Sequence, residues 1–270
     1  MAQIDIKNTT IRFLDGRQAT LLSDHTAAEA DLLFTAQPHI GSLLPRITFT
    51  DPAALSQPLA ITVSEYDIDI SLATDGAGLI TSIASDVVTA LPLVPAAVAL
   101  VSVALAPAEL GTGLLNALAQ ATMALGPRSL RLNVGEGNVT WSEKKAREYT
   151  RDTGTLDTVR NADEDPVEVT FDALWDFLKA DVGFQVTVSD VLKKRGEASV
   201  WITSDQGDIC QPYSVDIEIE FNPDCSPITK EYYIIPKFRY EDIGHDLSGG
   251  ALAFTGKSNV TEIIIHRSVR

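Results

Sequence analysis

The sequence predicts a mainly β protein. Most of its strands build a β-sandwich or barrel-forming domain with one α-helix, and a small α/β domain is inserted into this domain. The chain has 270 residues, enough for one large or two ordinary domains. Its 45% hydrophobic and 21% charged residues can supply a core, which excludes a disordered chain. Segments that alternate apolar and polar residues outnumber segments with helical spacing, and this favours strands.

The composition changes at two turn dipeptides, Asp15-Gly16 and Gly126-Pro127. Residues 17–127 are rich in Ala and Leu and contain two basic residues against ten acidic ones. Residues 128–270 contain the three tryptophans, both cysteines and most of the charge. We therefore predict a discontinuous domain made of residues 1–16 and 128–270, with residues 17–127 as the inserted domain.

Within the inserted domain, the segment "LAITVSEYDIDISLAT" (59–74) alternates in polarity and predicts a strand or hairpin. The segment "SIASDVVTAL" (82–91) places its apolar residues on one helical face, and Ser82 or Thr81 is a candidate N-cap. A further strand is predicted at "ALVSVAL" (99–105). The inserted domain is thus expected to be a small sheet with one helix packed on it.

The discontinuous domain is predicted to be mostly strand. One helix is expected at "TVSDVLKKRG" (187–196), where Thr187 or Ser189 caps the start, basic residues lie at the C-terminal end, and Gly196 ends the helix. The predicted strands are "SLRLNV", "NVTWSEKKAREYT", the start of "PVEVTFDALWDFL", "ASVWITS", "YSVDIEIEF", "EYYIIPKFRYE" and "SNVTEIIIHR".

The charge balance limits the partners of the chain. Lys and Arg number 21 against 37 Asp and Glu, a formal net charge of −16, which argues against binding DNA through a basic patch. The first residues, "MAQIDIKNTTIRFLDG", alternate and are charged, so no secretory signal is expected there. Three prolines interrupt the apolar run Val87 to Leu110, which is expected to be buried rather than to span a membrane.

No sequence motif predicts a catalytic, cofactor-binding or metal site. The stretch Asp75-Gly76-Ala77-Gly78 lacks the glycine spacing and the lysine of phosphate-binding loops, and it predicts a β-turn. The four histidines are not at metal-ligand spacing, and "GHDLSGG" (244–250) does not resemble a catalytic triad. A disulfide between Cys210 and Cys225 is not expected, because the strand predicted between them spans roughly 25–30 Å.

The segment "VDIEIEF" (215–221) alternates three carboxylates, Asp216, Glu218 and Glu220, with apolar residues. This pattern predicts a strand with one buried face and one face that displays a row of acidic side chains. Two interpretations remain open at this point: an ordinary solvated strand face, or a surface past which a polyanion slides without sticking. The acidic run "NADEDP" (161–166) is more typical of a solvated loop than of an acid/base pair.

Several segments, taken together and in order, resemble the major tail tube proteins of long-tailed (siphovirus-like) bacteriophages. They cover residues 1–16 and about 128–270, more than half of the chain. The segments are "IDIKNTTIRFLDG", the run Gly135 to Leu178 that begins "GEGNVTWSEKKAREYT", "TVSDVLKK", "CQPYSVDIEIEFNPDC" and "GGALAFTGKSNVTEIIIHR". Residues 17–127 then correspond to an insertion in the first hairpin, similar to a small α/β module that recurs in phage structural proteins.

The resemblance implies a structural virion protein without cofactor or enzymatic activity, assembled in the host cytoplasm into the phage tail. Homo-hexameric rings would stack into a tube around a tape measure protein, between the tail terminator and the distal tail or baseplate proteins. Double-stranded DNA would pass through the tube without specific binding, and no membrane would be involved. The inserted domain would lie on the outside, where it decorates the tail or braces neighbouring rings.

The resemblance also implies roles for individual residues. Asp216, Glu218 and Glu220 would face the lumen, where their charge repels DNA. The connection 151–166 would be the loop that contacts the next ring, and the N-terminal strand Ile4 to Leu14 would add contacts between subunits. The charged residues assigned to this inter-ring loop are Arg151, Asp157, Arg160, Asp163, Glu164 and Asp165.

Two alternatives stay open. An inner tube protein of a contractile tail or secretion-like system would share the fold and the ring assembly but would need a sheath partner. A soluble carboxylate-dependent hydrolase would instead need a pocket with paired acids or a metal ion.

Overall fold

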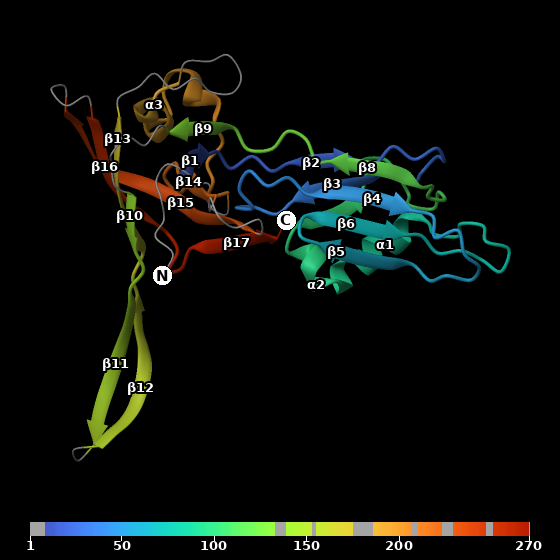
Figure 1. The fold of residues 1–270 in the computed structure, drawn as a ribbon, viewed down its shortest axis with the longest axis horizontal. Helices are drawn as coiled ribbons and strands as arrows, with labels where there is room; N and C mark the ends of the chain where they lie inside the picture. The colour runs from blue at the N-terminus through green and yellow to red at the C-terminus, as the bar shows by residue number, and fades with distance from the viewer. Residues whose placement is uncertain are drawn as a thin grey trace. The chain divides into compact units, whose positions relative to one another are not determined.

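A computed structural model shows the mainly β fold that the sequence predicts (Figure 1). Its contacts divide the chain into two compact units: unit 1 is residues 1–16 with 128–270, and unit 2 is residues 17–127. This division coincides with the two turn dipeptides at which the composition changes. The structure describes residues 9–132, 139–152, 155–174, 186–206, 210–222, 229–246 and 251–269.

Unit 1 is built on an eight-stranded sheet with the order β10-β13-β16-β15-β14-β1-β9, in which β17 also pairs with β15. Every pairing in this sheet is antiparallel. The strands are β1 (Thr9–Leu14), β9 (Ser129–Leu132), β10 (Val139–Ser142), β13 (Val167–Leu174), β14 (Val215–Phe221), β15 (Thr229–Asp246), β16 (Ala251–Ser258) and β17 (Ile264–Val269).

The long strand β15 joins the two halves of this sheet. Its first half pairs with β14 and β17, and its second half pairs with β16. At the junction, Pro236 and Lys237 together oppose the single residue Asp216, and Lys237 has a φ of 56°. Such a bulge bends a strand and increases its twist. Both halves contribute to one core, in which Phe254 stacks on Phe171 with ring centroids 4.7 Å apart.

The helix predicted in unit 1 is confirmed as α3 (Val188–Lys193). Thr187 Oγ1 accepts a hydrogen bond from the Asp190 amide, and Asp190 Oδ2 accepts one from the Thr187 amide, which completes a capping box. The helix ends at Lys194, whose φ of 52° is left-handed, and not at Gly196 as expected.

The strand predicted at "ASVWITS" is wrong. This segment contains the 3-10 helix η3 (Gly196–Val200) followed by an extended stretch. The buried residues are Ala198 and Trp201, three positions apart, while Val200 and Ile202 are exposed. The buried side therefore follows a helical period, although the segment is rich in residues that favour strands.

Unit 2 has two sheets where the sequence predicted one. The three-stranded sheet has the order β2-β3-β7, and the four-stranded sheet has the order β5-β6-β4-β8, with β4 and β6 parallel. The elements are β2 (Thr20–Leu22), β3 (Leu32–Ala36), β4 (Arg46–Thr50), β5 (Ala60–Ser64), β6 (Asp67–Ser71), α1 (Ala84–Ala90), η2 (Leu91–Leu93), α2 (Pro95–Val98), β7 (Val101–Leu105) and β8 (Leu118–Thr122).

The local predictions for unit 2 are confirmed at three places: the hairpin β5–β6, the helix α1 and the strand β7. The predicted N-cap is wrong, because Ile83 occupies that position and Ser82 Oγ instead accepts a hydrogen bond from the Ala73 amide. The long apolar run folds into the end of α1, then η2, α2 and β7. Of the helices in the described ranges, none has the length and apolar character needed to cross a membrane.

The segments that lead into and out of unit 2 are hydrogen-bonded to each other, both at the end of unit 1 and at the start of unit 2. In unit 1, β1 and β9 are neighbours, with Leu14 opposite Ser129, and the Asp15 amide donates to the Arg128 carbonyl at 3.1 Å. In unit 2, Thr20 and Ala124 exchange two backbone hydrogen bonds of 2.8 and 2.9 Å. Adjacent ends allow a domain to be inserted at a hairpin tip without straining the host sheet.

His25 in unit 2 makes stability depend on pH. The imidazole is buried edge-on against Phe49, and its Nδ1 accepts a hydrogen bond from the Asn116 amide at 3.3 Å. Burial lowers its pKa, although contacts with Asn116 and Asp31 oppose this effect. The unfolded chain then binds more protons than the folded one, so stability is complete above the ordinary histidine pKa and is lost as the pH falls below it.

We expect the denaturant midpoint of unit 2 to fall between pH 7 and pH 5 in the wild type, and to fall less in His25→Gln. Urea unfolding at several pH values measures this slope. His39→Asn, a histidine change in the same unit, should keep the wild-type slope. An unchanged slope in His25→Gln would contradict the assignment.

Candidate functional site

The three carboxylates assigned to the lumen lie on β14, between β1 and β15. Their exposed fractions are 3% for Asp216, 0% for Glu218 and 7% for Glu220. The prediction that this strand displays an exposed acidic face is therefore wrong for the described chain. All seven residues of β14 are buried, because the strand is internal to the sheet and both of its faces are covered.

Two cations, Arg12 and Lys230, neutralise Glu218 and Glu220, and these four side chains form an ion cluster. The register of β1 and β14 places Arg12 opposite Glu218, and Arg12 Nη1 lies 2.7 Å from Glu218 Oε1 and 2.8 Å from Glu220 Oε2. Lys230 Nζ lies 2.7 Å from Glu220 Oε1. Charge-assisted hydrogen bonds of this length compensate the cost of burying the carboxylates, and they link β1, β14 and β15.

Glu220 stays ionised at neutral pH. Burial opposes ionisation of Glu220, but the hydrogen bonds from Lys230 and Arg12 outweigh it and hold its pKa below the usual value. Burial, followed by the charges of Glu220 and Glu218, raises the pKa of Tyr232 to about 12. A carboxylate with a lowered pKa carries no proton to donate near pH 7, so Glu220 is poorly suited to be a general acid.

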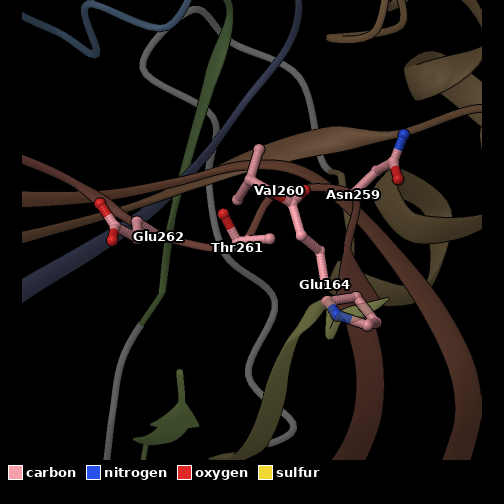
Figure 2. Close-up of a pocket in the computed structure, with 6 residues that line it drawn as sticks. Glu164, Asn259, Val260, Thr261 and Glu262 are labelled. Carbon is pink, nitrogen blue, oxygen red and sulfur yellow. The ribbon is translucent and has the colours of Figure 1, made fainter. Parts of the chain in front are cut away.

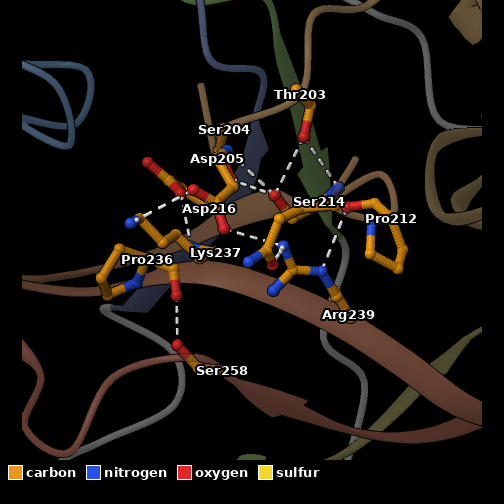
Figure 3. Close-up of polar contacts among 11 residues, drawn as sticks. Thr203, Ser204, Asp205, Pro212, Ser214, Asp216, Pro236, Lys237, Arg239 and Ser258 are labelled. Carbon is orange, nitrogen blue, oxygen red and sulfur yellow. Dashed lines mark hydrogen bonds and ion pairs between the residues drawn. The ribbon is translucent and has the colours of Figure 1, made fainter. Parts of the chain in front are cut away.

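Asp216 has a different role at the β15 bulge. Its Oδ1 accepts a hydrogen bond of 2.9 Å from the Lys237 amide (Figure 3). Beside it, Asp205 pairs with Lys237 Nζ at 3.3 Å and with Arg239 Nη2 at 2.8 Å. Sequence reasoning missed Asp205. Its signal was weak, because a lone aspartate in a predicted loop has no periodic pattern around it.

Removing the Asp216 carboxylate should destabilise unit 1. In Asp216→Ala, the Lys237 amide loses its acceptor at a partly buried bulge, and we expect a loss of about 1–3 kcal/mol in the free energy of unfolding. Asp216→Asn retains an acceptor oxygen and should lose less. Urea unfolding of both variants measures the difference. Equal stability of Asp216→Ala and wild type would contradict a structural role for this carboxylate.

Residues 151–166, which were expected to form a loop, belong mostly to a β-hairpin, and their contact with a neighbouring ring stays a prediction. The strands β11 (Lys145–Asp152) and β12 (Thr155–Glu164) pair antiparallel, with Glu148 opposite Arg160. They form a two-stranded sheet that pairs with no other strand in the described part of the chain. The segment has no sustained apolar alternation, and backbone pairing between polar strands leaves little trace in a sequence.

Of the six residues assigned to inter-ring contacts, two have described side chains. Glu164 and Asp165 are exposed at the base of the hairpin. The side chains of the other four lie outside the described part of the structure: Arg151, Asp157, Arg160 and Asp163. Residues 1–8 of the N-terminal strand also lie outside the described ranges, and β1 begins at Thr9.

A surface hollow of about 440 Å³ lies beside the hairpin base (Figure 2). It is lined by Glu164, Pro166 and the residues 259–262, which connect β16 to β17. Glu262 pairs with Lys145 at the start of β11, and Lys144 Nζ lies 3.0 Å from Glu168. Across the described ranges, no group of three or more His, Cys, Asp or Glu side chains is arranged to hold a metal ion.

The glycine-containing stretch in unit 2 forms the predicted turn. Asp75 Oδ1 accepts hydrogen bonds from the Ala77 and Leu79 amides, and Gly78 has a φ of 82°. These amides donate their hydrogen bonds to the aspartate, so they do not form a phosphate-binding loop. Cys210 is exposed, while Cys225 and most of "GHDLSGG" lie outside the described residues.

No protein-family model, curated protein or solved structure matches this chain.

Proposed function

We propose that this chain is a structural subunit of a phage tail tube, in which unit 1 assembles into stacked hexameric rings. The observation that carries the proposal is the open sheet of unit 1. Among the described strands, β9 and β10 each pair on one side only. Open edges invite pairing with another chain, and a ring in which each subunit pairs with the next removes them.

The hairpin β11–β12 supports assembly along the tube. A two-stranded hairpin is marginally stable in water unless another element packs against it. A subunit of the next ring supplies such an element. The hairpin base carries both signs of charge: Lys145 lies opposite Glu164 in the β11–β12 register, and Lys144 and Asp165 adjoin them in the sequence. Ion pairs between rings at this level would each be worth about 0–1 kcal/mol if exposed. Their repetition around each ring adds to the strength of the stack.

The buried carboxylates change the proposed electrostatics of the conduit. Glu218 and Glu220 are neutralised by Arg12 and Lys230, so β14 does not offer DNA a bare acidic wall. Repulsion of the passing duplex comes instead from the net charge of −16 per subunit, which is multiplied in the assembled tube. The cluster on β14 holds together the strands that carry the ring.

Electron microscopy tests this proposal directly. The purified full-length chain is concentrated, with and without the distal tail proteins that would nucleate a tube, and imaged in negative stain. We expect stacked rings with a central channel. A chain that remains monomeric under both conditions would contradict the proposal.

A further inference from the structure

The charges of the four-stranded sheet in unit 2 lie on its inner strands. Arg46 on β4 and Asp67 and Asp69 on β6 are its charged residues, and the edge strands β5 and β8 have none. Arg46 Nη2 donates to Asp67 Oδ2 at 2.7 Å across the parallel pair. This arrangement is the reverse of the usual one, in which charged residues or prolines protect the edges of a sheet.

Both edge strands have one strand neighbour each, and the segment that follows β8 bridges to Thr20 of β2 at Ala124. In the described structure, β5 pairs only with β6, and β8 pairs only with β4. Alternate residues of β5 are exposed, as are Ala119, Gln120 and Thr122 of β8. The partly buried Ile61 and Val63 of β5 pack on the same core as Ala97 of α2, so the helix covers the inner face of this strand. Over Ala60–Ser64 and Leu118–Thr122, the described structure places no strand on the outer side of either edge.

The sequence segments that contain the two edge strands are also uncharged, although Thr62 and Ser64 of β5 lie opposite Asp69 and Asp67 of β6. Residues 52–64 and 110–127 contain no Asp, Glu, Lys or Arg, although unit 2 as a whole has ten acidic residues against two basic ones. Two copies of such a unit repel each other unless they meet through neutral surfaces. Exposed leucines lie in these same segments, at Leu55, Leu110, Leu114 and Leu125. A second copy of this chain is therefore the partner that the edges fit.

We infer that the β5 edge of one copy pairs with the β8 edge of a neighbouring copy, so that the sheet of unit 2 continues from subunit to subunit. The strand directions favour this pairing. β5 is antiparallel to β6, β6 is parallel to β4, and β4 is antiparallel to β8, so β5 and β8 run in the same direction. Copies related by a small rotation or by stacking then join β5 to β8 as a parallel pair. This contact is heterologous and extends through a ring or a stack, whereas β5 paired with β5 about a two-fold axis would stop at a dimer.

This inference rests on the proposed assembly into rings, and it gives the inserted unit a bracing role in that assembly. The test uses the full chain in a Cys210→Ser and Cys225→Ser background. Thr62→Cys and Gln120→Cys are combined in one chain, and Ser64→Cys with Gln120→Cys samples the neighbouring register. After oxidation of the assembled material, we expect a ladder of disulfide-linked dimers, trimers and larger species on a non-reducing gel. Each single cysteine variant should give no ladder.

A charge variant provides an independent measurement. Thr62→Lys with Gln120→Lys places protective charges on both edges and should make the tubes dissociate at a lower urea concentration than the wild type. Thr89→Lys, on α1 of the same unit, is the matched control and should leave the tubes unchanged. Tubes that form without a ladder and are unaffected by the edge lysines would overturn the inference but leave the proposed function intact. A dimer from Thr62→Cys alone would show two-fold pairing and also overturn it, and the absence of any rings would overturn both proposals.

Discussion

Arg12→Met is expected to lower the free energy of unfolding of unit 1 by about 3–5 kcal/mol at neutral pH. The substitution removes the cation that contacts both Glu218 and Glu220 and leaves Glu220 with Lys230. Glu218 has no exposed surface, so its charge would lose compensation without gaining water. Breaking a buried ion pair on one side costs more than the pair itself contributes, because an unpaired charge stays buried.

The pH dependence of this variant separates lost charge compensation from lost packing. In the wild type, the lowered pKa of Glu220 contributes stability that is present above the ordinary glutamate pKa and is lost as the pH falls. Without Arg12, burial of Glu220 is opposed by Lys230 alone, so the variant is expected to lose part of this contribution. We therefore expect the difference between Arg12→Met and wild type to be larger at pH 8 than at pH 5.

Arg131→Met is the matched control for this measurement. Arg131 lies directly opposite Arg12 on β9 and is exposed, and it donates a hydrogen bond of 3.3 Å to Thr10 Oγ1. Its loss should cost about 1 kcal/mol or less and should not change with pH. Urea unfolding of both variants between pH 5 and pH 8 gives the comparison. If Arg12→Met were as stable as Arg131→Met at every pH, the ion cluster would have no structural role.

The glutamate cluster shows where sequence reasoning reaches its limit. Alternation along "VDIEIEF" correctly predicts β14 and its apolar face. Arg12 covers the other face. It is 206 residues from Glu218 in the sequence and lies between Ile11 and Phe13 on β1. An arginine on the polar side of one strand and glutamates on the polar side of another are visible separately. Their pairing becomes visible only when the register of the two strands is known.

The same distinction holds elsewhere in the chain. Local signals sufficed for α3, whose capping box is encoded by Thr187 and Asp190, and for the turn at Asp75. They predicted most of β11, within the segment 138–150, but failed for β12, which is held to it by backbone hydrogen bonds, and for η3, where strand-favouring residues adopt a helical period to bury Trp201. The second sheet of unit 2 was missed because its strands are short and its pairings join distant segments, such as β4 with β8.

Deleting residues 18–126 and inserting Asn-Gly in their place is expected to leave unit 1 folded. Asp15 and Arg128 are already hydrogen-bonded neighbours, so the replacement closes a hairpin of five loop residues between them. Hairpins commonly have loops of 2–5 residues, and the entropy of loop closure changes slowly with length. Urea unfolding should give a free energy within about 1 kcal/mol of the wild-type value for this unit. A collapse of its stability would mean that the two units are not independent.

The assembly of this deletion variant distinguishes the roles of the two units. If unit 1 builds the ring and unit 2 braces it through β5 and β8, the variant should still form tubes in negative stain. Those tubes should dissociate at a lower urea concentration than the wild type, as the edge-lysine variant should. Unit 2 alone, residues 17–127, serves as the control, because it retains both neutral edges but lacks the eight-stranded sheet. It should fold and form no tube. Tubes from unit 2 alone, or none from the deletion variant, would reverse the roles assigned here, because the edges of β5 and β8 would then be the primary contacts of the assembly.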